Sequence, residues 1–275
     1  MKHSANSLPR DDDTPFVMAL TLPTELIDKI ISSIDDDEHS LMLCSLVARD
    51  WVPCSRFHLF RSVQLIKNSL PSFLELLHDQ HSTIRCAVEC IGFDGSYGPS
   101  ERGDWSQLVY DGLAELAPLL PGLSCLQLKY LRGFDSEQFI GPDILGLSSG
   151  LAPLTQLELC NVLFASFIEV SNLILASPAL EDLFLMAVSW RGYRSGRISV
   201  SPMRLRRLGL MCDDRYQRDV MNWLLSQDPI PLISHLRFTV YKYRSASAIG
   251  QYLRIVGPSL TDLVLQFGSY SDAGK

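Results

Sequence analysis

Leucine recurs along most of this chain in the spacing L-x-x-L-x-L. Five complete copies occur: Leu123–Leu126–Leu128, Leu154–Leu157–Leu159, Leu180–Leu183–Leu185, Leu205–Leu208–Leu210 and Leu260–Leu263–Leu265. Weaker copies are Phe60–Val63–Leu65, Val88–Ile91–Phe93 and Ile233–Leu236–Phe238. Successive middle residues are 28, 35, 31, 26, 25, 28 and 27 residues apart. Because side chains alternate between the faces of a strand, each copy predicts a short strand whose second and third apolar residues are buried.

The segments between these strands have the apolar spacing of helices. They are Phe73–Leu77, Leu108–Leu116, Phe167–Leu175, Val220–Leu225 and Ile249–Val256. A proline lies just ahead of most strands, namely Pro121, Pro153, Pro178, Pro202, Pro231 and Pro258. Proline suits the corner where a helix must stop, because it lacks an N–H and has a fixed φ. Each unit is thus a strand followed by a helix, and it can bury its apolar face only when neighbours stack on it.

This period resembles the leucine-rich repeats, whose units are about 20–29 residues long. The resemblance implies an α/β solenoid with parallel strands on the concave face and helices outside. It is an irregular resemblance, because regular members have Asn or Cys three residues after the third leucine. The residues at that position here are Ser96, Leu131, Val162, Val188, Asp213, Tyr241 and Gly268. We therefore expect a short, variable arc.

Residues 22–60 predict a separate module of three short helices. Apolar residues on one side of the first helix are Leu22, Leu26, Ile27, Ile30, Ile31 and Ile34. An acidic loop, Asp35–Glu38, ends this helix, and Ser40 is the expected cap of the second one. About forty residues with this much apolar surface cannot bury all of it internally, so a partner helix surface is expected.

This module resembles an F-box. The matching residues are Leu22, Pro23, Glu25, Leu26, Ile30, Ile31, Ile34, Asp36, Leu41, Cys44, Val47, Arg49 and Trp51. The resemblance implies a fungal-type substrate receptor of a Skp–cullin–F-box ubiquitin ligase, in which the F-box binds the Skp-type adaptor and through it a cullin. By the same resemblance, the adaptor-binding residues are Leu22, Pro23, Leu26, Ile30, Ile31, Leu41, Val47 and Trp51. Ile34 and Trp51 are as readily core residues as contact residues.

Strand alternation also identifies the residues on the outward face of the predicted sheet. Three of them, Phe184, Met186 and Met211, are large and apolar, and Arg207, His235 and Arg237 lie beside them as a basic strip. These six form the candidate target-binding site. Eight arginines between residues 191 and 218 reinforce the positive charge, which suits an acidic or phosphorylated peptide. Two alternatives stay open: a solvated loop with incidental charge, and apolar residues covered by a loop or the tail.

Composition and charge exclude several other classes of protein. A net charge of −7 argues against a nucleic-acid binder, and the sequence has no apolar run long enough to span a membrane. Seven cysteines without framework spacing favour a reducing compartment, so the cytoplasm or nucleus is expected. Cys86 and Cys90 lack a second pair at zinc spacing. No catalytic, metal or cofactor motif was found, so no cofactor and no enzymatic activity are expected.

The sequence therefore predicts three parts: an acidic disordered tail over 1–19, the F-box helical module over 20–62 and the repeats over 63–275. The favoured function is a substrate-recognition subunit of the ligase, whose repeats bind an unknown target protein for ubiquitin-dependent degradation. The alternative is a non-catalytic leucine-rich-repeat interaction scaffold whose F-box-like module serves no ubiquitin transfer. The last strand has no evident terminal cap, so either the tail Gly268–Lys275 covers it or the chain is a truncated relative.

Overall fold

The computed structural model describes residues 22–34, 37–96, 104–131, 151–192, 202–240 and 246–267. The chain divides into two compact units, Met1–Ser55 and Arg56–Lys275. The expected disordered tail over 1–19 and the tail Gly268–Lys275 lie outside the described residues.

The first unit is helical in its described part. It contains α1 (Thr24–Ser32), α2 (Glu38–Val47), the short 3₁₀ helix η1 (Arg49–Trp51) and the start of α3 (Val52–Arg61). Asp37 caps α2, because its carboxylate accepts the backbone N–H of Ser40 at 3.3 Å and the Ser40 hydroxyl at 2.6 Å. The prediction that Ser40 caps this helix was therefore wrong. Asp37 is the cap, and Ser40 lies in the first turn of α2 and donates both hydrogen bonds.

The second unit is an α/β structure built on a sheet of eight parallel strands. The strands are β1 (Ser62–Leu65), β2 (Cys90–Asp94), β3 (Cys125–Lys129), β4 (Gln156–Cys160), β6 (Asp182–Met186), β8 (Arg207–Met211), β9 (His235–Val240) and β10 (Asp262–Phe267). They pair in the order β1-β2-β3-β4-β6-β8-β9-β10. The strands of this sheet therefore lie side by side in the order in which they occur in the sequence. All eight strands predicted from the leucine spacing are confirmed.

Two further strands were not predicted. β5 (Leu163–Ser166) and β7 (Ser189–Gly192) pair in parallel as a separate two-stranded sheet. Each follows a strand of the large sheet after a residue with a positive φ, Asn161 at 55° before β5 and Ala187 at 51° before β7. A left-handed residue turns the chain sharply, and this turn lets a second short strand leave the plane of the first.

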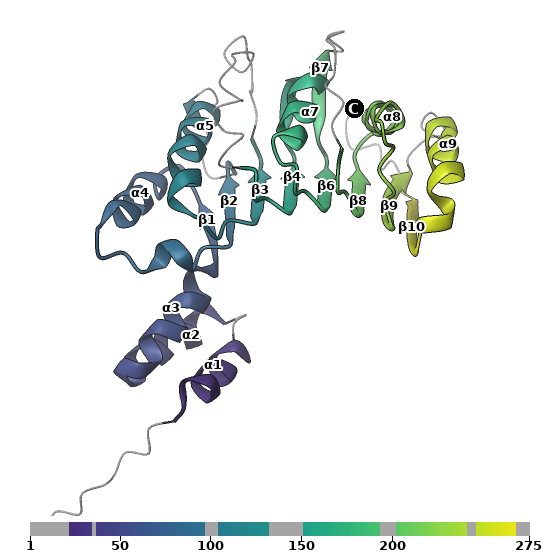
Figure 1. Ribbon diagram of the computed structural model, residues 1–275. Helices are drawn as coiled ribbons and strands as arrows, with labels where there is room; N and C mark the ends of the chain where they lie inside the picture. Colours follow the sequence, from purple (N-terminus) through teal and green to yellow (C-terminus); the bar gives the residue numbers. More distant parts are fainter. Residues whose placement is uncertain are drawn as a thin grey trace, which may run out of the picture. The chain divides into compact units, whose positions relative to one another are not determined.

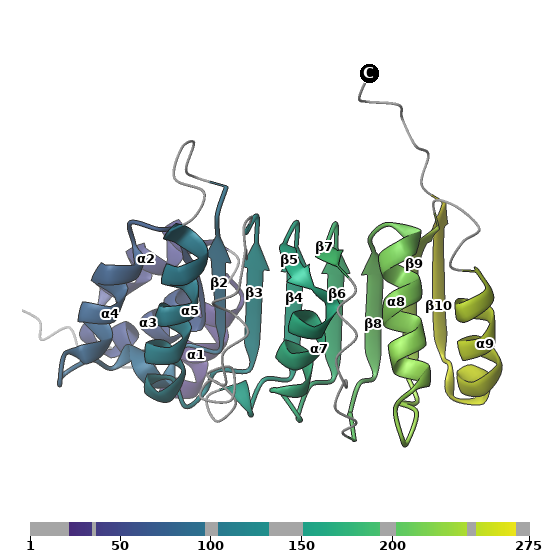
Figure 2. The ribbon, with the colours of Figure 1, turned by 90° about the horizontal axis from the view of Figure 1, so that it is seen from above.

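The five predicted helical segments are also confirmed. They are α4 (Leu70–His78), α5 (Asp104–Leu116), α7 (Phe167–Leu175), α8 (Asp214–Leu225) and α9 (Ala246–Val256). Figure 1 looks along the strands, which follow a shallow arc with these helices on its outer side. Figure 2 shows the same helices in front of the strands, all along one face of the sheet. The other face of the sheet is called the free face below.

One apolar core fills the space between the sheet and its helices. The second and third apolar residues of each repeat are buried there from β2 to β9, as in Ile91, Leu157 and Leu210, all at 0% exposure. Burying one leucine fully contributes about 1.5–3 kcal/mol, so the leucine spacing itself stabilises the stack. The pattern ends at β10, where Leu263 and Leu265 are 40% and 45% exposed because no further repeat covers them in the described chain.

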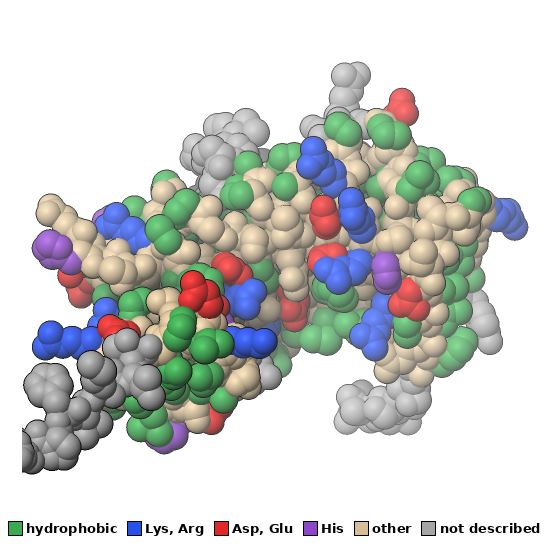
Figure 3. All heavy atoms as spheres, turned by 60° about the horizontal axis from the view of Figure 1, so that its bottom comes forward, with side chains coloured by type: hydrophobic (Ala, Val, Ile, Leu, Met, Phe, Trp, Pro, Cys, Tyr) green, Lys and Arg blue, Asp and Glu red, His purple; other side chains and the backbone are tan. Residues whose placement is uncertain are grey.

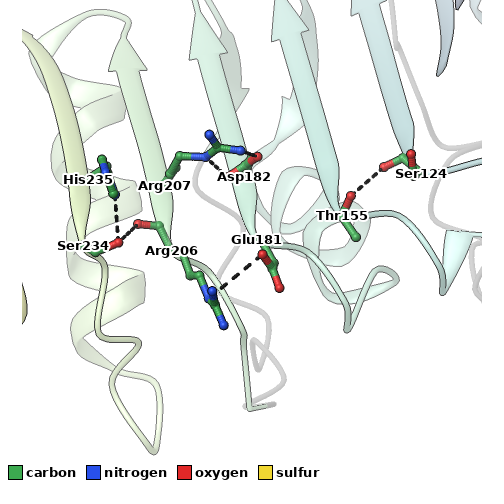
Figure 4. Close-up of polar contacts among 8 residues, drawn as sticks. All are labelled: Ser124, Thr155, Glu181, Asp182, Arg206, Arg207, Ser234 and His235. Atoms are coloured by element: carbon green, nitrogen blue, oxygen red, sulfur yellow. Dashed lines mark hydrogen bonds and ion pairs between the residues drawn. The ribbon is translucent and has the colours of Figure 1, made fainter. Parts of the chain in front are cut away.

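A ladder of hydrogen bonds joins the residues that precede the strands. The Glu181 carbonyl accepts the N–H groups of Arg206 and Arg207, and the Arg206 carbonyl accepts those of Ser234 and His235. The same bonds join Glu89, Ser124, Thr155 and Thr261 to their neighbours. Side chains add to the ladder, since Thr155 Oγ1 donates to the Ser124 carbonyl at 3.2 Å (Figure 4). These bonds satisfy the backbone at one end of the sheet without an Asn ladder.

Candidate functional site

Two stripes of apolar residues run along α1, and only one of them is buried. Ile27 and Ile31 are 3% and 0% exposed, whereas Leu26 and Ile30 are 48% and 43% exposed. Residues four apart lie on the same side of a helix, so each pair forms one stripe. The single apolar side predicted for this helix therefore divides into a buried half and an exposed half. Leu22, ahead of the helix, is also exposed at 43%.

The second helix exposes more apolar surface than the sequence suggested. Leu41 is buried at 2%, whereas Met42, Leu43, Leu46 and Val47 are all substantially exposed. Leu46 is 80% exposed and Val47 65% exposed. Met42, Leu43 and Leu46 were missed because the F-box resemblance names only Leu41, Cys44 and Val47 on this helix. The available signal was the segment Leu41–Val47 itself, which is apolar at six of its seven positions.

The predicted adaptor-binding residues therefore fall into three groups. Leu22, Pro23, Leu26, Ile30 and Val47 are exposed. Ile31 and Leu41 are buried, so their side chains are withdrawn from the surface on which a partner could bind. Trp51, in η1, is half-buried.

The exposed apolar residues of the first unit are treated below as one set, the helical apolar set. Its members are Leu22, Leu26, Ile30, Met42, Leu43, Leu46 and Val47. Figure 3 shows hydrophobic side chains gathered on the helices of this unit. Isolated exposed leucines are ordinary on protein surfaces, but seven exposed apolar residues within the 26 positions 22–47 are a concentration typical of interaction sites.

On the second unit, the parallel register arranges the free face in rows that cross the strands. One row contains Cys90, Cys125, Gln156, Asp182, Arg207, His235 and Asp262. The middle row contains Gln64, Gly92, Gln127, Glu158, Phe184, Gly209, Arg237 and Val264. A third row includes Asp94, Lys129, Cys160, Met186 and Met211. The outward positions predicted from the leucine spacing are the ones that the structure places on this face.

The charge of the predicted basic strip is partly neutralised within the sheet. The Arg207 guanidinium donates through Nε and Nη2 to both carboxylate oxygens of Asp182 on the neighbouring strand (Figure 4). This contact raises the pKa of Arg207 and leaves the Asp182 side chain only 9% exposed. Arg207 was predicted to belong to a positive strip, but a bidentate ion pair with Asp182 neutralises its charge. The sequence pattern did not predict this pairing.

Other arginines of the 191–218 segment are also engaged. Arg206 Nε lies 4.0 Å from Glu181 Oε2, Arg218 Nε lies 4.0 Å from Asp219 Oδ1, and the Arg215 guanidinium lies 5.8 Å from the centre of the Tyr216 ring. Arg194 and Arg197 fall outside the described residues. His235 and Arg237, on β9, are exposed. Figure 3 accordingly shows charges of both signs over the strands, so the face is mixed in charge.

The predicted apolar trio does lie together on the free face. Met186 and Met211 are register partners on β6 and β8, and Met186 is 37% exposed. Phe184 and Gly209 are also register partners, and a Cβ atom built on Gly209 would meet Cδ1 of Phe184 at 2.5 Å. The Phe184 ring therefore lies over the backbone of β8, where only glycine leaves room for it. Phe184 and Met211 are half-buried as a result.

Comparisons with known proteins add little to this geometry. No protein-family model matches the chain, and no curated protein matches it. Among solved structures, the chain is similar to a Bacteroides fragilis protein determined by structural genomics, with 16% identity and a TM-score of 0.35. That match covers 78% of this chain and 75% of the other.

The described residues hold neither a metal-binding cluster nor a membrane-spanning helix. They contain no group of three or more His, Cys, Asp or Glu side chains placed to hold a metal ion. Within the same ranges, no helix is long and apolar enough to cross a membrane.

Proposed function

We propose that this chain is an F-box protein with irregular leucine-rich repeats, the substrate-recognition subunit of a Skp–cullin–F-box ubiquitin ligase. In this proposal the first unit binds a Skp-type adaptor, and through it a cullin, while the second unit holds a target protein. The chain would contribute no acid, base or nucleophile. Catalysis would come from the proximity that the assembly gives to the target.

The helical apolar set is the observation that carries the proposal. Leu22, Leu26 and Ile30 remain exposed although Ile27 and Ile31, on the same helix, are buried. Exposing such side chains to water forgoes about 1.5–3 kcal/mol for each one that a partner could bury completely. An apolar face on short helices is the kind of surface that packs against helices of another protein. The F-box resemblance names that protein as the Skp-type adaptor.

The arrangement of the second unit supports the leucine-rich-repeat assignment. Strands follow one another in chain order, helices lie on one side, and the residue before each strand repeats the same hydrogen bonds. In a solenoid, each repeat contacts only its neighbours and leaves a long face open for binding. We assign target binding to this face around Phe184, Met186 and Met211, with His235 and Arg237 beside them and the Arg207–Asp182 pair at the border.

Adaptor binding by the full chain tests the first half of the proposal. Leu26→Ala combined with Ile30→Ala should weaken binding to a purified Skp-type adaptor at least about tenfold, since truncating two central contacts commonly costs more than about 1.4 kcal/mol. Leu22→Ala combined with Pro23→Ala should weaken it as well. Lys29→Ala, an exposed change on the same helix, is the matched control and should bind as the unaltered chain does.

The far-ultraviolet circular dichroism of each variant should be unchanged, which separates lost contacts from lost folding. Unchanged adaptor binding in both double variants would overturn the F-box assignment. Co-purification of a cullin with the adaptor then distinguishes a ligase subunit from a scaffold, because a scaffold outside ubiquitin transfer should lack the cullin.

A further inference from the structure

Two cysteines on the free face, Cys90 and Cys125, lie opposite each other on neighbouring strands. Cys90 begins β2 and Cys125 begins β3, and the two are register partners. Their Sγ atoms are hydrogen-bonded at 2.9 Å. Both thiols are free; the sequence pattern brought up Cys90 only with Cys86, as a pair that lacks zinc spacing, and gave Cys125 no role. The proposed adaptor and target functions do not use this pair.

The backbone spacing already suits a disulfide between these residues. Paired strands lie about 4.7–4.9 Å apart. A disulfide joins Cα atoms about 4.4–6.8 Å apart. The sulfurs therefore need only to approach each other by side-chain rotation, and the strands can keep their register. Cys160, which lies on the same face, differs because its register partners are Lys129 and Met186.

The two thiols differ in their exposure and in the direction in which their pKa values are shifted. Cys90 is half-buried, whereas Cys125 is buried at 9% exposure. The hydrogen bond with Cys125 lowers the pKa of Cys90 to about 7 against the opposing effect of burial, and the Ser62 hydroxyl and the Lys129 charge lower it further while Glu158 raises it. The same hydrogen bond and burial raise the pKa of Cys125. Cys90 is thus the thiol that ionises first and Cys125 the one that keeps its proton, which is the division of roles between an attacking and a resolving cysteine.

We propose that Cys90 and Cys125 are a hydroperoxide-sensitive thiol pair that closes to a disulfide between β2 and β3. The Cys90 thiolate attacks the outer oxygen of the hydroperoxide, the O–O bond breaks, and the departing alkoxide takes a proton to become an alcohol, or water from hydrogen peroxide. Cys90 is then a sulfenic acid. The Cys125 sulfur attacks the Cys90 sulfur, the S–O bond breaks, and the hydroxide leaves as water with the Cys125 proton. Two thiols are oxidised by two electrons and one hydroperoxide is reduced.

The disulfide would tie β2 to β3 and close the loop of chain between residues 90 and 125. Closing a loop restricts the unfolded chain, so oxidation should raise the melting temperature of the second unit. Reduction by a dithiol reverses the change.

Hydrogen peroxide is the probe, added to the full-length reduced chain in the Cys86→Ser background. That background is needed because Cys86 and Cys90 lie in the same tryptic peptide, Cys86–Arg102, whereas Cys125 lies in Gly103–Lys129. The expected product has lost two hydrogens, joins these two peptides, regains both thiols with dithiothreitol and melts at a higher temperature. Alkylation of Cys90 by iodoacetamide should reach half its maximal rate near pH 7.

Single substitutions complete the test. Cys125→Ser should stop at a sulfenic acid on Cys90 that dimedone traps, and Cys90→Ser should abolish the rapid loss of thiols. Cys160→Ser is the matched control on the same face and should form the disulfide at the unaltered rate. A disulfide that joins other cysteines or two chains, or a Cys90 that reacts no faster than Cys160, would overturn the proposal.

Discussion

The first unit and the free face of the second unit differ in whether their exposed side chains have partners within the chain. On the first unit, Leu26 and Ile30 project into solvent from a helix whose adjacent stripe, Ile27 and Ile31, is already buried. On the free face, other strands of the sheet supply partners: Asp182 on β6 holds Arg207 on β8, and Gln64 on β1 reaches across Gly92 of β2 to donate from Nε2 to Gln127 Oε1 on β3 at 3.0 Å. An apolar surface without internal partners is a candidate site for binding another protein. A surface on which charged side chains pair with one another, as Arg207 does with Asp182, has a weaker electrostatic field than its sequence suggests.

The largest expected effect contrasts the two stripes of α1. Ile31→Ala should destabilise the first unit by about 2–5 kcal/mol, because it removes a fully buried side chain and leaves a cavity. Ile30→Ala should change the stability by no more than about 0.5 kcal/mol, because the side chain is exposed. Hydrogen exchange of the peptide amides of α1 in the full chain measures both. Equal losses of protection would mean that the two stripes are not distinct.

The next prediction contrasts two arginines of the free face. Arg207→Ala should destabilise the second unit by about 1–3 kcal/mol, towards the lower end because Arg207 itself is well exposed, since it leaves the nearly buried Asp182 carboxylate without its two donors. Arg237→Ala should cost less than about 0.5 kcal/mol. Urea unfolding followed by tryptophan fluorescence gives both values. Adding Asp182→Asn to Arg207→Ala should recover part of the loss, and no recovery would show that the pair is not coupled.

A smaller effect is expected from the two glycines of the middle row. Gly209→Ala should cost about 1 kcal/mol, because the new Cβ meets the Phe184 ring at 2.5 Å and forces this large side chain off the sheet. Gly92→Ala should cost less, because the atoms it meets are the far end of the flexible Gln64 side chain. Thermal unfolding measures the difference. If Gly92→Ala proved the more costly of the two, the ring would not lie where the structure places it.

The smallest effect concerns the cap of α2. Hydrogen bonds from the Ser40 hydroxyl and N–H hold the pKa of Asp37 below its ordinary value of 3.8. A lowered pKa in the folded chain means that the stability from this cap is present above the ordinary value and is lost as the pH falls through the folded one. Nuclear magnetic resonance titration of the Asp37 carboxyl should show the low pKa, and Ser40→Ala should move it upward. An unmoved pKa would rule out the hydrogen bond as its cause.

The sequence by itself determined the strands and the side of the sheet that each residue occupies. The L-x-x-L-x-L spacing locates all eight strands of the large sheet and separates buried residues such as Leu157 from outward ones such as Glu158. The physical reason is local, since side-chain alternation within one strand fixes which residues point inward. The helices follow for the same reason, because apolar residues at helical spacing identify a buried side without knowledge of its partner.

Only the tertiary structure decided which residues meet across the strands and which half of a broad apolar helix is buried. Asp182 and Arg207 are 25 residues apart, and Cys90 and Cys125 are 35 apart, so their contacts depend on strand register that no local pattern contains. On α1, the apolar residues Leu26, Ile27, Ile30 and Ile31 form one broad apolar side, and packing selects Ile27 and Ile31 for burial. Leu26 and Ile30 stay exposed because no described part of the chain covers their half of the apolar side.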